Sequence, residues 1–266
     1  MTELLAPAKL NLALVVGPKR PDGKHEVATV LQRIALADTV RLEPAEELEV
    51  HGFPDDTLVR RALELAAAHA GAEPRWRATI EKQIPVASGL GGGSSDAAAA
   101  LKLANGTLGG ALSSDQLHGI AAELGTDVPF FLTTGPQLGE GDGTELTPLD
   151  LPQDYWVVLV MPGAKGKHST AAVYGAFDVR NGAEGFEQRR AELMRALVLG
   201  DLAALPPNDL ADSPLAGELL DQGAFRADVT GAGPAVYGLF AEESQAVTAS
   251  AALAARGETF VTTSGW

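Results

Sequence analysis

Residues 85–96 read Pro-Val-Ala-Ser-Gly-Leu-Gly-Gly-Gly-Ser-Ser-Asp, and this stretch decides the fold. A strand-like stretch, residues 77–82, precedes it, and the alanine-rich residues 97–104, which have high helix propensity, follow it. Glycine has no Cβ, so the backbone can adopt positive φ and approach a ligand closely. One of the polar side chains at positions 94–96 is predicted to cap the helix. This order of strand, glycine loop and helix is typical of a phosphate site, because the free N–H groups of the helix face an anion.

Two common nucleotide-binding loops are excluded at this position. A Walker A loop ends in Gly-Lys-Ser/Thr, and residues 85–96 contain no lysine. A dinucleotide fingerprint that begins at Gly89 requires glycine where Ser94 stands, and one that begins at Gly91 requires glycine where Asp96 stands. The remaining alternative is a flexible turn before a helix, which does not require so many small residues.

The composition is that of a globular chain with one large or two modest domains. The chain has 266 residues, of which 45% are hydrophobic and 21% are charged. It contains no cysteine, and its first residues lack the basic and apolar stretches of a secretory signal. No apolar stretch reaches the roughly 18 residues that a membrane-spanning helix needs. We therefore expect a cytoplasmic protein without a membrane partner.

The net charge of the chain is strongly negative. A charge of -15 disfavours nucleic acids and anionic membranes as partners. A site for an anionic ligand must therefore be locally basic, and the sequence contains two basic clusters. One consists of Lys9, Lys19, Arg20, Lys24 and His25, and the other of Lys165, Lys167 and His168. Ordinary solvated surface is the alternative interpretation of each cluster.

Strand-like and helix-like stretches follow one another in a mixed order, which predicts an α+β fold. The expected strands are residues 9–16, 26–35, 39–42, 47–50, 77–82, 156–161, 227–229, 236–240 and 258–263. The expected helices are residues 58–70, 96–104, 113–124, 170–177, 185–199, 215–222 and 242–256, and residues 137–145 resemble a hairpin. Ser113 or Ser114 is the expected cap of the third helix. Pro148 and Pro152 indicate a boundary between domains at 1–150 and 151–266.

Lys9 and Asn11 are two positions apart on a predicted strand, so their side chains project from the same face. A lysine there can hold a negative charge or polarise a hydroxyl group, and a neighbouring asparagine can fix its orientation. The alternative is an exposed strand face that carries two unrelated polar residues.

Asp127 lies between the helix stop at Gly125 and the apolar residues 129–131. A carboxylate next to so much apolar surface is expected to be either a helix cap or a catalytic group. As a catalytic group it would accept the proton of a substrate hydroxyl during phosphoryl transfer.

The glycine stretch resembles the ATP-binding loop of the GHMP kinases, the superfamily of galactokinase, homoserine kinase, mevalonate kinase and phosphomevalonate kinase. Its form is closest to the branch that phosphorylates the 2-hydroxyl of 4-diphosphocytidyl-2-C-methyl-D-erythritol in the non-mevalonate route to isoprenoids. Residues 6–12 resemble the first motif of this branch, residues 125–131 its catalytic segment, and residues 229–235 the third motif of the superfamily. The resemblance covers almost the whole chain.

This resemblance implies an N-terminal domain like the second domain of ribosomal protein S5 and a ferredoxin-like C-terminal domain. It implies ATP and Mg²⁺ as cofactors, Asp127 as the general base and Lys9 as its electrostatic partner. ATP is expected to bind Pro85, Val86, Ala87, Ser88, Gly89, Leu90, Gly91, Gly92, Gly93, Ser94 and Ser95. The alcohol substrate is expected to bind Asn11, Lys24, His25, Thr170, Gly231, Ala232 and Gly233. The metal ligands are unknown: Ser95 is one candidate, and an ion held by phosphate and water is the other.

Lys24 departs from the pattern of this branch, which has tyrosine at that position as a stacking platform for cytosine. His25 matches the histidine that reads the edge of the base. Either another aromatic side chain, with Tyr174 and Phe177 as candidates, replaces the tyrosine, or Lys24 covers the ring with its stem and places its charge near the diphosphate. The second alternative is favoured here, because an acidic protein needs local positive charge.

Two rival functions stay open at this point. One is another GHMP kinase that acts on mevalonate, homoserine or a sugar, against which residues 22–25, Asp-Gly-Lys-His, argue. The other is a catalytically silent sensor of the same fold that binds ATP, against which the presence of both Lys9 and Asp127 argues. The protein is expected to be a monomer or a homodimer.

Overall fold

The computed structural model describes residues 2–53, 57–163 and 169–265, and it divides into two compact units that interleave along the chain. Unit 1 consists of Met1–Ala8, Leu36–Ala87 and Gly91–Thr134. Unit 2 consists of Lys9–Ala35, Ser88–Leu90 and Gly135–Trp266. These units are defined by contacts and not by chain order, so the division expected at residue 150 stays a prediction. The second basic cluster, Lys165, Lys167 and His168, lies outside the described residues.

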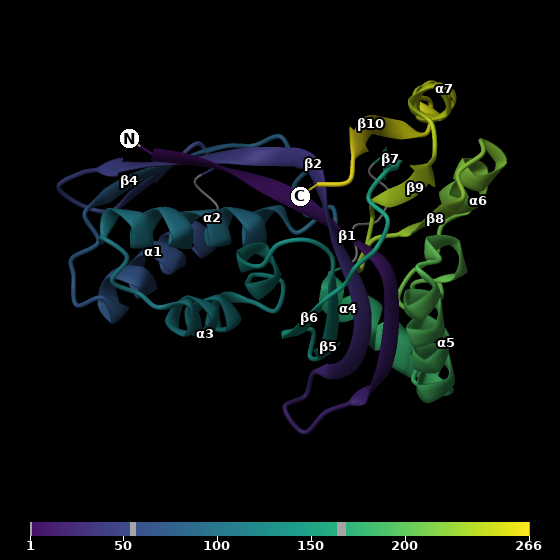
Figure 1. The fold of residues 1–266 in the computed structure, drawn as a ribbon, viewed down its shortest axis with the longest axis horizontal. Helices are drawn as coiled ribbons and strands as arrows, with labels where there is room; N and C mark the ends of the chain where they lie inside the picture. The colour runs from purple at the N-terminus through teal and green to yellow at the C-terminus, as the bar shows by residue number, and fades with distance from the viewer. Residues whose placement is uncertain (1, 54–56, 164–168, 266) are drawn as a thin grey trace. The chain divides into compact units, whose positions relative to one another are not determined.

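Two long strands, β1 (Thr2–Lys19) and β2 (His25–Pro44), belong in part to each unit. In unit 1 the second half of β2 pairs antiparallel with β4 (Trp76–Glu81), which also pairs parallel with β3 (Glu49–His51). Three helices pack on one another beside these strands: α1 (Thr57–His69), α2 (Gly92–Thr107) and α3 (Ser114–Leu124) (Figure 1). A short 3₁₀ helix, η1 (Pro129–Leu132), packs against α2 and α3.

The sequence of α1 explains why this helix is buried on one side. Its buried residues are Val59, Ala62, Leu63, Ala66 and Ala67, which recur every three or four positions. In an α-helix this spacing produces one continuous apolar stripe, which packs against the neighbouring elements.

In unit 2 the first half of β2 pairs with β5 (Gln137–Gly141), which forms a hairpin with β6 (Glu145–Pro148). A second sheet has the order β10-β7-β9-β8 and is antiparallel throughout. Its strands are β7 (Trp156–Pro162), β8 (Arg226–Val229), β9 (Val236–Phe240) and β10 (Gly257–Thr263). The helices of this unit are α4 (Thr170–Val179), α5 (Phe186–Leu199), α6 (Pro214–Asp221) and α7 (Glu243–Leu253), with the 3₁₀ helix η2 (Leu202–Ala204) between α5 and α6.

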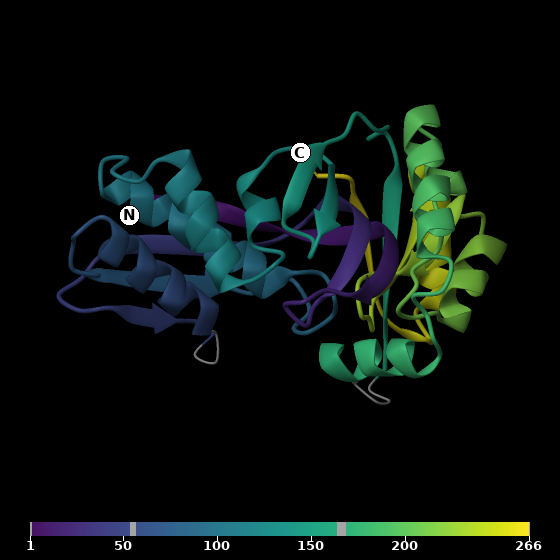
Figure 2. The same cartoon turned by 90° about the horizontal axis from the view of Figure 1, so that it is seen from below.

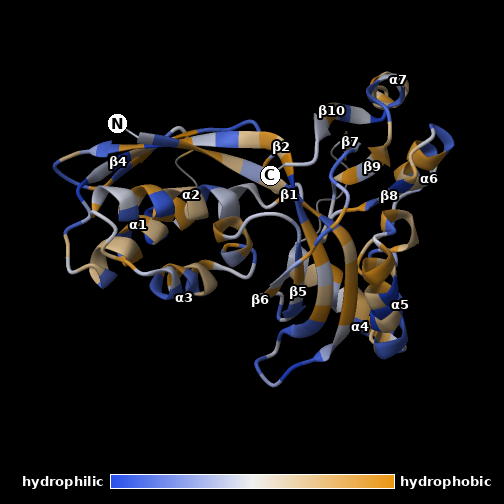
Figure 3. Cartoon of the chain, viewed as in Figure 1, coloured by the Kyte–Doolittle hydropathy of each residue, from blue (hydrophilic) through white to orange (hydrophobic). Residues whose placement is uncertain are grey.

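The core of unit 2 lies between this sheet and two of the helices. α6 packs against β8 and β9, and α7 packs against β7. Figure 2 shows this part of the chain, in green and yellow, from a second direction. Val158, Val236 and Phe240 are buried there with Leu219 and Ala249. Figure 3 shows the hydrophobic colour concentrated along β9 and the curved stretch of β1.

Most of the expected elements are present, and the largest difference concerns the first two strands. Residues 26–35 and 39–42 were expected as separate strands, whereas β2 is continuous from His25 to Pro44. β1 is also longer than residues 9–16, and nearly all of its residues from 6 to 17 are buried, so both of its faces are covered. The expected cap of α3 is confirmed, because Ser113 forms a reciprocal capping box with Gln116.

Candidate active site

Lys9 and Asn11 are buried in unit 2, with 4% and 5% of their surface exposed, so they do not form an exposed strand face. The Lys9 ammonium donates to Asn11 Oδ1 at 2.6 Å. Asn11 Nδ2 donates to Thr29 Oγ1 at 2.8 Å, and the Asn11 backbone N–H donates to Thr230 Oγ1 at 3.0 Å. The strand therefore brings the two side chains together as the spacing predicted, and two buried hydroxyl groups hold Asn11 in place.

Residues 88–90 of the glycine loop pack against residues 230–235 of the same unit. Residues 230–235 are called the second glycine loop. The backbone N–H of Ala235 donates to Ser88 O at 3.0 Å, and the N–H of Lys9 donates to Leu90 O at 2.9 Å. Gly89 has φ +87°, and a Cβ at this position would lie 2.5 Å from Thr230 O. The two glycine loops can approach this closely only because Gly89 has no side chain.

In unit 1 the loop continues into α2, whose N-cap is Gly91 in the left-handed conformation, with φ 72°. No side chain caps this helix among the described residues, so the expected cap at 94–96 is wrong. Helical geometry already begins at Gly92, which places those polar residues inside the first turns. The half-buried N–H groups of this turn are thus left for an anion, and the Ser95 hydroxyl is buried there without a hydrogen bond in the described chain. This arrangement fits a phosphate group.

A buried ionic triad beside this turn was missed in the sequence. Lys82 donates to Asp38 Oδ2 at 2.5 Å and to Asp96 Oδ2 at 2.7 Å, and both aspartates are fully buried. Asp38 Oδ1 accepts the backbone N–H groups of Gln83 and Ile84, which lead into the glycine loop. Burial lowers the pKa of Lys82, but the bonds to the two aspartates outweigh this effect and raise it. An aspartate inside an apolar strand was the available signal, because a buried carboxylate requires a partner.

His25 is buried in unit 2 and contacts three side chains of α4. Its ring stacks on Tyr174 with a centroid distance of 4.9 Å and meets Phe177 edge-on at 5.8 Å. Its Nε2 lies 2.8 Å from Asp178 Oδ1, and Lys19 pairs with the other oxygen of this carboxylate at 2.7 Å. The bonds from Lys19 and His25 lower the pKa of Asp178.

Lys24, next to His25, is directed to a different partner. Its ammonium pairs with Asp142 at 2.5 Å, and about half of its side chain is exposed. Burial raises the pKa of Asp142, but the bonds from Lys24 and Thr144 outweigh it and lower the pKa. The charge that was expected to reach a diphosphate is therefore paired with a carboxylate in this structure.

Asp127 is half-buried in unit 1, in the turn that follows α3. The N-cap residue of η1 is Val128, and no described side chain caps that helix. Asp127 is therefore not the N-cap residue of η1, and its role as the base stays a prediction.

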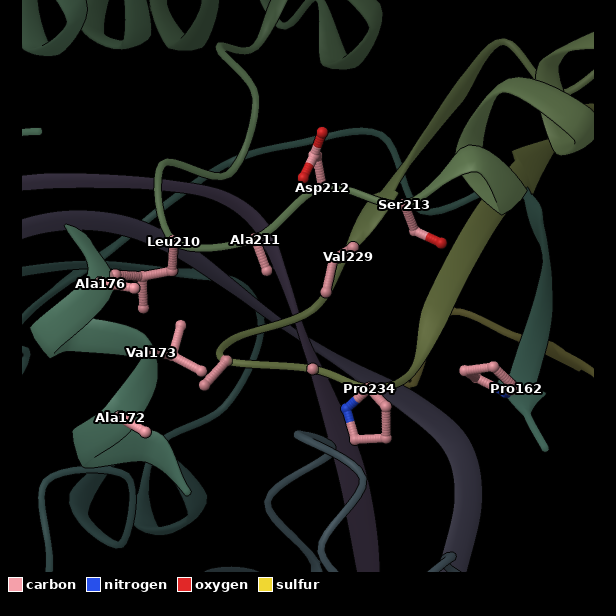
Figure 4. Close-up of a pocket in the computed structure, with 12 residues that line it drawn as sticks. Pro162, Ala172, Val173, Ala176, Leu210, Ala211, Asp212, Ser213, Val229 and Pro234 are labelled. Carbon is pink, nitrogen blue, oxygen red and sulfur yellow. The ribbon is translucent and has the colours of Figure 1, made fainter. Parts of the chain in front are cut away.

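A cavity of about 380 Å³ lies in unit 2 beside the second glycine loop. Figure 4 shows the small side chains of α4 facing Leu210 and Ala211, with Pro234 on the side of the glycine loop. Ala232 and Gly233, two of the expected substrate residues, line this cavity. A third, Thr170, is the exposed first residue of α4. Two of the expected substrate residues thus lie at this cavity, and Thr170 belongs to a helix that also lines it.

Asn208 holds the second glycine loop from behind. Its Nδ2 donates to Val229 O at 2.9 Å and to Gly231 O at 2.7 Å, and its Oδ1 accepts the N–H of Leu210 at 2.8 Å. Its own N–H donates to Asp228 Oδ2 at 2.8 Å. Asn208 therefore has a structural role, because its side chain fixes the backbone of this loop.

The described residues contain neither a helix that could span a membrane nor a group of metal-ligating side chains. No helix in the described part of the chain is long and apolar enough to cross a membrane. Within residues 2–53, 57–163 and 169–265, no three His, Asp or Glu side chains are grouped as a metal site.

Comparison with known families agrees with this geometry. Residues 57–135 match the family described as GHMP kinases N terminal domain, and residues 187–259 match GHMP kinases C terminal. The chain is 41% identical to the 4-diphosphocytidyl-2-C-methyl-D-erythritol kinase of Rhodococcus jostii, over 95% of this chain and 88% of that protein. It is 38% identical to the enzyme of the same name from a Geobacter species, over 94% and 93%. The chain therefore belongs to the GHMP kinase family, in the branch that contains these enzymes.

Solved structures give the same result for the fold. A crystal structure of 4-(cytidine 5'-diphospho)-2C-methyl-D-erythritol kinase superimposes with a TM-score of 0.84 and 32% identity, over all of both chains. A homoserine kinase from Cytophaga hutchinsonii superimposes with a TM-score of 0.72 and 17% identity, over 98% of this chain and 94% of that one. The second match extends the likeness in fold to other GHMP kinases.

Proposed function

We propose that the protein transfers the γ-phosphoryl group of ATP to the 2-hydroxyl of 4-diphosphocytidyl-2-C-methyl-D-erythritol. The hydroxyl oxygen attacks the γ-phosphorus, the bond from that phosphorus to the bridging oxygen breaks, and ADP leaves. The products are ADP and the 2-phosphate of the alcohol. The relatives that carry this name and match nearly the whole chain support the choice of reaction.

Asp127 is the general base in this proposal, and it takes the proton that the 2-hydroxyl loses. A positioned base is worth about 10²–10⁴ in rate. Lys9 is the electrostatic partner, whose ammonium stabilises negative charge on the reacting oxygens. Its bond to Asn11 supports this role, because a buried lysine held in one orientation needs no reorganisation during the reaction.

ATP is expected at the glycine loop, residues 85–95, with its phosphates near the free N–H groups of the first turn of α2. When bound with ATP, Mg²⁺ would neutralise charge on the phosphate oxygens. The buried Ser95 hydroxyl is the candidate protein ligand, since it has no hydrogen bond within the described residues.

The cytidine end of the alcohol is expected at His25 and Tyr174. A base can stack on the exposed part of an aromatic ring and bond the edge of a histidine. The sugar-derived chain would then lie toward the second glycine loop, where Gly231, Ala232 and Gly233 leave room for a substrate.

The observation that carries the proposal is the position of the Lys9–Asn11 pair next to Gly231 of the second glycine loop. A Cβ on Gly231 would lie 3.5 Å from Lys9 Nζ and 3.3 Å from Asn11 Oδ1. The ammonium thus lies close to the backbone of a glycine-rich loop, which supports a role in binding an anionic group.

An ADP-release assay tests the proposal, with the diphosphocytidyl alcohol compared with mevalonate, homoserine and galactose. ADP release should depend on the diphosphocytidyl alcohol alone. Release with mevalonate, homoserine or galactose would instead identify another GHMP kinase. Binding of ATP by calorimetry, without ADP release on any alcohol, would identify a silent sensor.

A further inference from the structure

We infer that Thr29 is a positioning residue for the reaction, because its hydroxyl sets the orientation of the Asn11 amide and thereby that of the Lys9 ammonium. This inference rests on the proposed function, in which Lys9 acts on the reacting oxygens. Thr29 lies in the middle of β2, and neither a motif nor its spacing from the glycine loops draws attention to it.

The three side chains are all removed from water. Thr29 and Lys9 are each 4% exposed, and Asn11 is 5% exposed. Buried polar groups in proteins are almost always hydrogen-bonded, since an unmade bond there leaves the desolvation cost uncompensated. Each proton of this network therefore needs an acceptor within the protein.

The direction of each proton follows from the chemistry of its donor. The ammonium of Lys9 can only donate, so the Asn11 atom at 2.6 Å must be the carbonyl oxygen. The NH₂ end of the amide then faces Thr29 Oγ1 at 2.8 Å and donates to it. Thr29 has one proton to give, and it goes to Ala13 O at 2.8 Å. The hydroxyl is thus an acceptor toward Asn11, and only one orientation of the amide satisfies all four groups.

Loss of the Thr29 hydroxyl would leave the buried NH₂ group of Asn11 without its acceptor, while Lys9 and Thr230 Oγ1, at 2.6 and 3.5 Å, would still donate to Asn11 Oδ1. The NH₂ group would then shift toward another acceptor, and Asn11 Oδ1 would move with it. The Lys9 ammonium, which donates to that oxygen, would be displaced in turn. The backbone of Asn11 would keep its bond to Thr230, so the strand and the second glycine loop would stay in place.

The test compares two substitutions at position 29 with a matched control. Thr29→Val keeps the shape of the side chain but removes the hydroxyl, and Thr29→Ser keeps the hydroxyl. Tyr237→Phe is the control, because it removes another buried hydroxyl that bonds the backbone of β1. The Tyr237 hydroxyl donates to Leu12 O at 3.0 Å. The measurements are kcat, KM for ATP and for the diphosphocytidyl alcohol, and Tm.

Thr29→Val should lower kcat by roughly 10²-fold, the usual effect of misplacing a reacting group by about 1 Å, with KM for ATP within about twofold of the parent. Thr29→Ser should restore kcat to within about threefold, and Tyr237→Phe should lower Tm but not kcat. A Thr29→Val enzyme with the kcat of the parent would overturn the inference, and so would a Thr29→Ser enzyme as slow as Thr29→Val.

A second substitution keeps the test decisive if Thr29→Val folds poorly. Asn11→Asp makes the two ends of the side chain equivalent, so no orientation has to be set. Adding Thr29→Ala to Asn11→Asp should therefore lower kcat by less than about threefold, whereas Thr29→Ala alone should lower it as much as Thr29→Val. Equal losses in both backgrounds would contradict the inference. A parent enzyme that is inactive on every alcohol would contradict the proposed function instead.

Discussion

Tyr174 lies against the ring of His25, with the ring centroids 4.9 Å apart and an angle of 29° between the planes. His25 is the residue expected to read the base, and the neighbouring Lys24 is paired with Asp142. We therefore propose an aromatic side chain from α4, in place of the stem of Lys24, as the stacking platform for the cytosine.

The first prediction is that Tyr174 supplies the stacking surface for the cytosine. Tyr174→Ala should raise KM for the diphosphocytidyl alcohol by about 5- to 150-fold, because stacking of a base on an aromatic ring is worth about 1–3 kcal/mol. Tyr174→Phe should keep the parental value, and Lys24→Ala should change it less than about twofold. Steady-state kinetics at two salt concentrations measures this, and a salt-dependent loss confined to Lys24→Ala would restore the other alternative.

The second prediction concerns Asp127. Asp127→Asn should lower kcat by about 10²–10⁴, because asparagine cannot accept the proton of the hydroxyl, while the affinity for ATP should stay the same. Asp150→Asn removes the same charge from an exposed position and serves as the control. If Asp127→Asn turns over within about threefold of the parent, Asp127 is not the base.

The candidate site was predictable where its residues share one local segment. Lys9 and Asn11 project from one face because strand geometry alone sets that relationship, and the glycine loop is readable from residues 85–96. The helix start was misplaced because capping rules favour a polar side chain, whereas Gly91 takes the left-handed conformation and leaves the turn open.

Partners that come from distant segments were not predictable. Asp38 and Lys82 are 44 positions apart, and Thr29 and Asn11 are 18 positions apart on different strands. Neither pair has a local pattern, because only strand pairing and packing bring the residues together. The continuity of β2 was missed for a related reason, since its two halves pair with different strands and each resembles a separate strand.

The third prediction tests the contact between the two glycine loops. Gly89→Ala should weaken ATP binding at least about tenfold, because its Cβ would meet Thr230 O at 2.5 Å and alanine resists a φ of +87°. Gly106→Ala, in α2, is the control, since a Cβ there meets nothing within 4 Å. It should leave ATP affinity unchanged and raise the free energy of unfolding by about 0.5–1 kcal/mol. Calorimetry with ATP and urea unfolding measure the two effects, and unchanged ATP affinity in a folded Gly89→Ala protein would contradict this prediction.

The fourth prediction concerns stability at alkaline pH. Tyr237 is fully buried, donates to Leu12 O and accepts from Arg226 Nε. Burial raises its pKa from 10.0 to about 12. Below pH 10 the hydroxyl is protonated in both states, and between pH 10 and about 12 the unfolded chain loses the proton that the folded chain keeps. The free energy of unfolding should therefore fall by about 1.4 kcal/mol per pH unit in this window on account of this group.

Tyr237→Phe has no proton to lose and should flatten that slope. Urea unfolding at intervals from neutral pH to pH 12 measures the difference between the parent and the variant. Burial also raises the pKa of Tyr155, and the charge of Tyr237 raises it further, so the difference between the two proteins includes a smaller contribution from Tyr155. Parallel curves for the two proteins would mean that Tyr237 ionises no later in the folded state than in the unfolded state.

The bond between Asn11 and Thr230 joins residues 219 positions apart, and it has a consequence for the order of events during synthesis. Lys9 and Asn11 leave the ribosome long before the loop that faces them. Contacts of such long range form late, because a large loop must close first. A nascent chain that stops before residue 230 should therefore carry the phosphate loop and its helix without the surface against which Gly89 packs, and such a chain should not bind ATP.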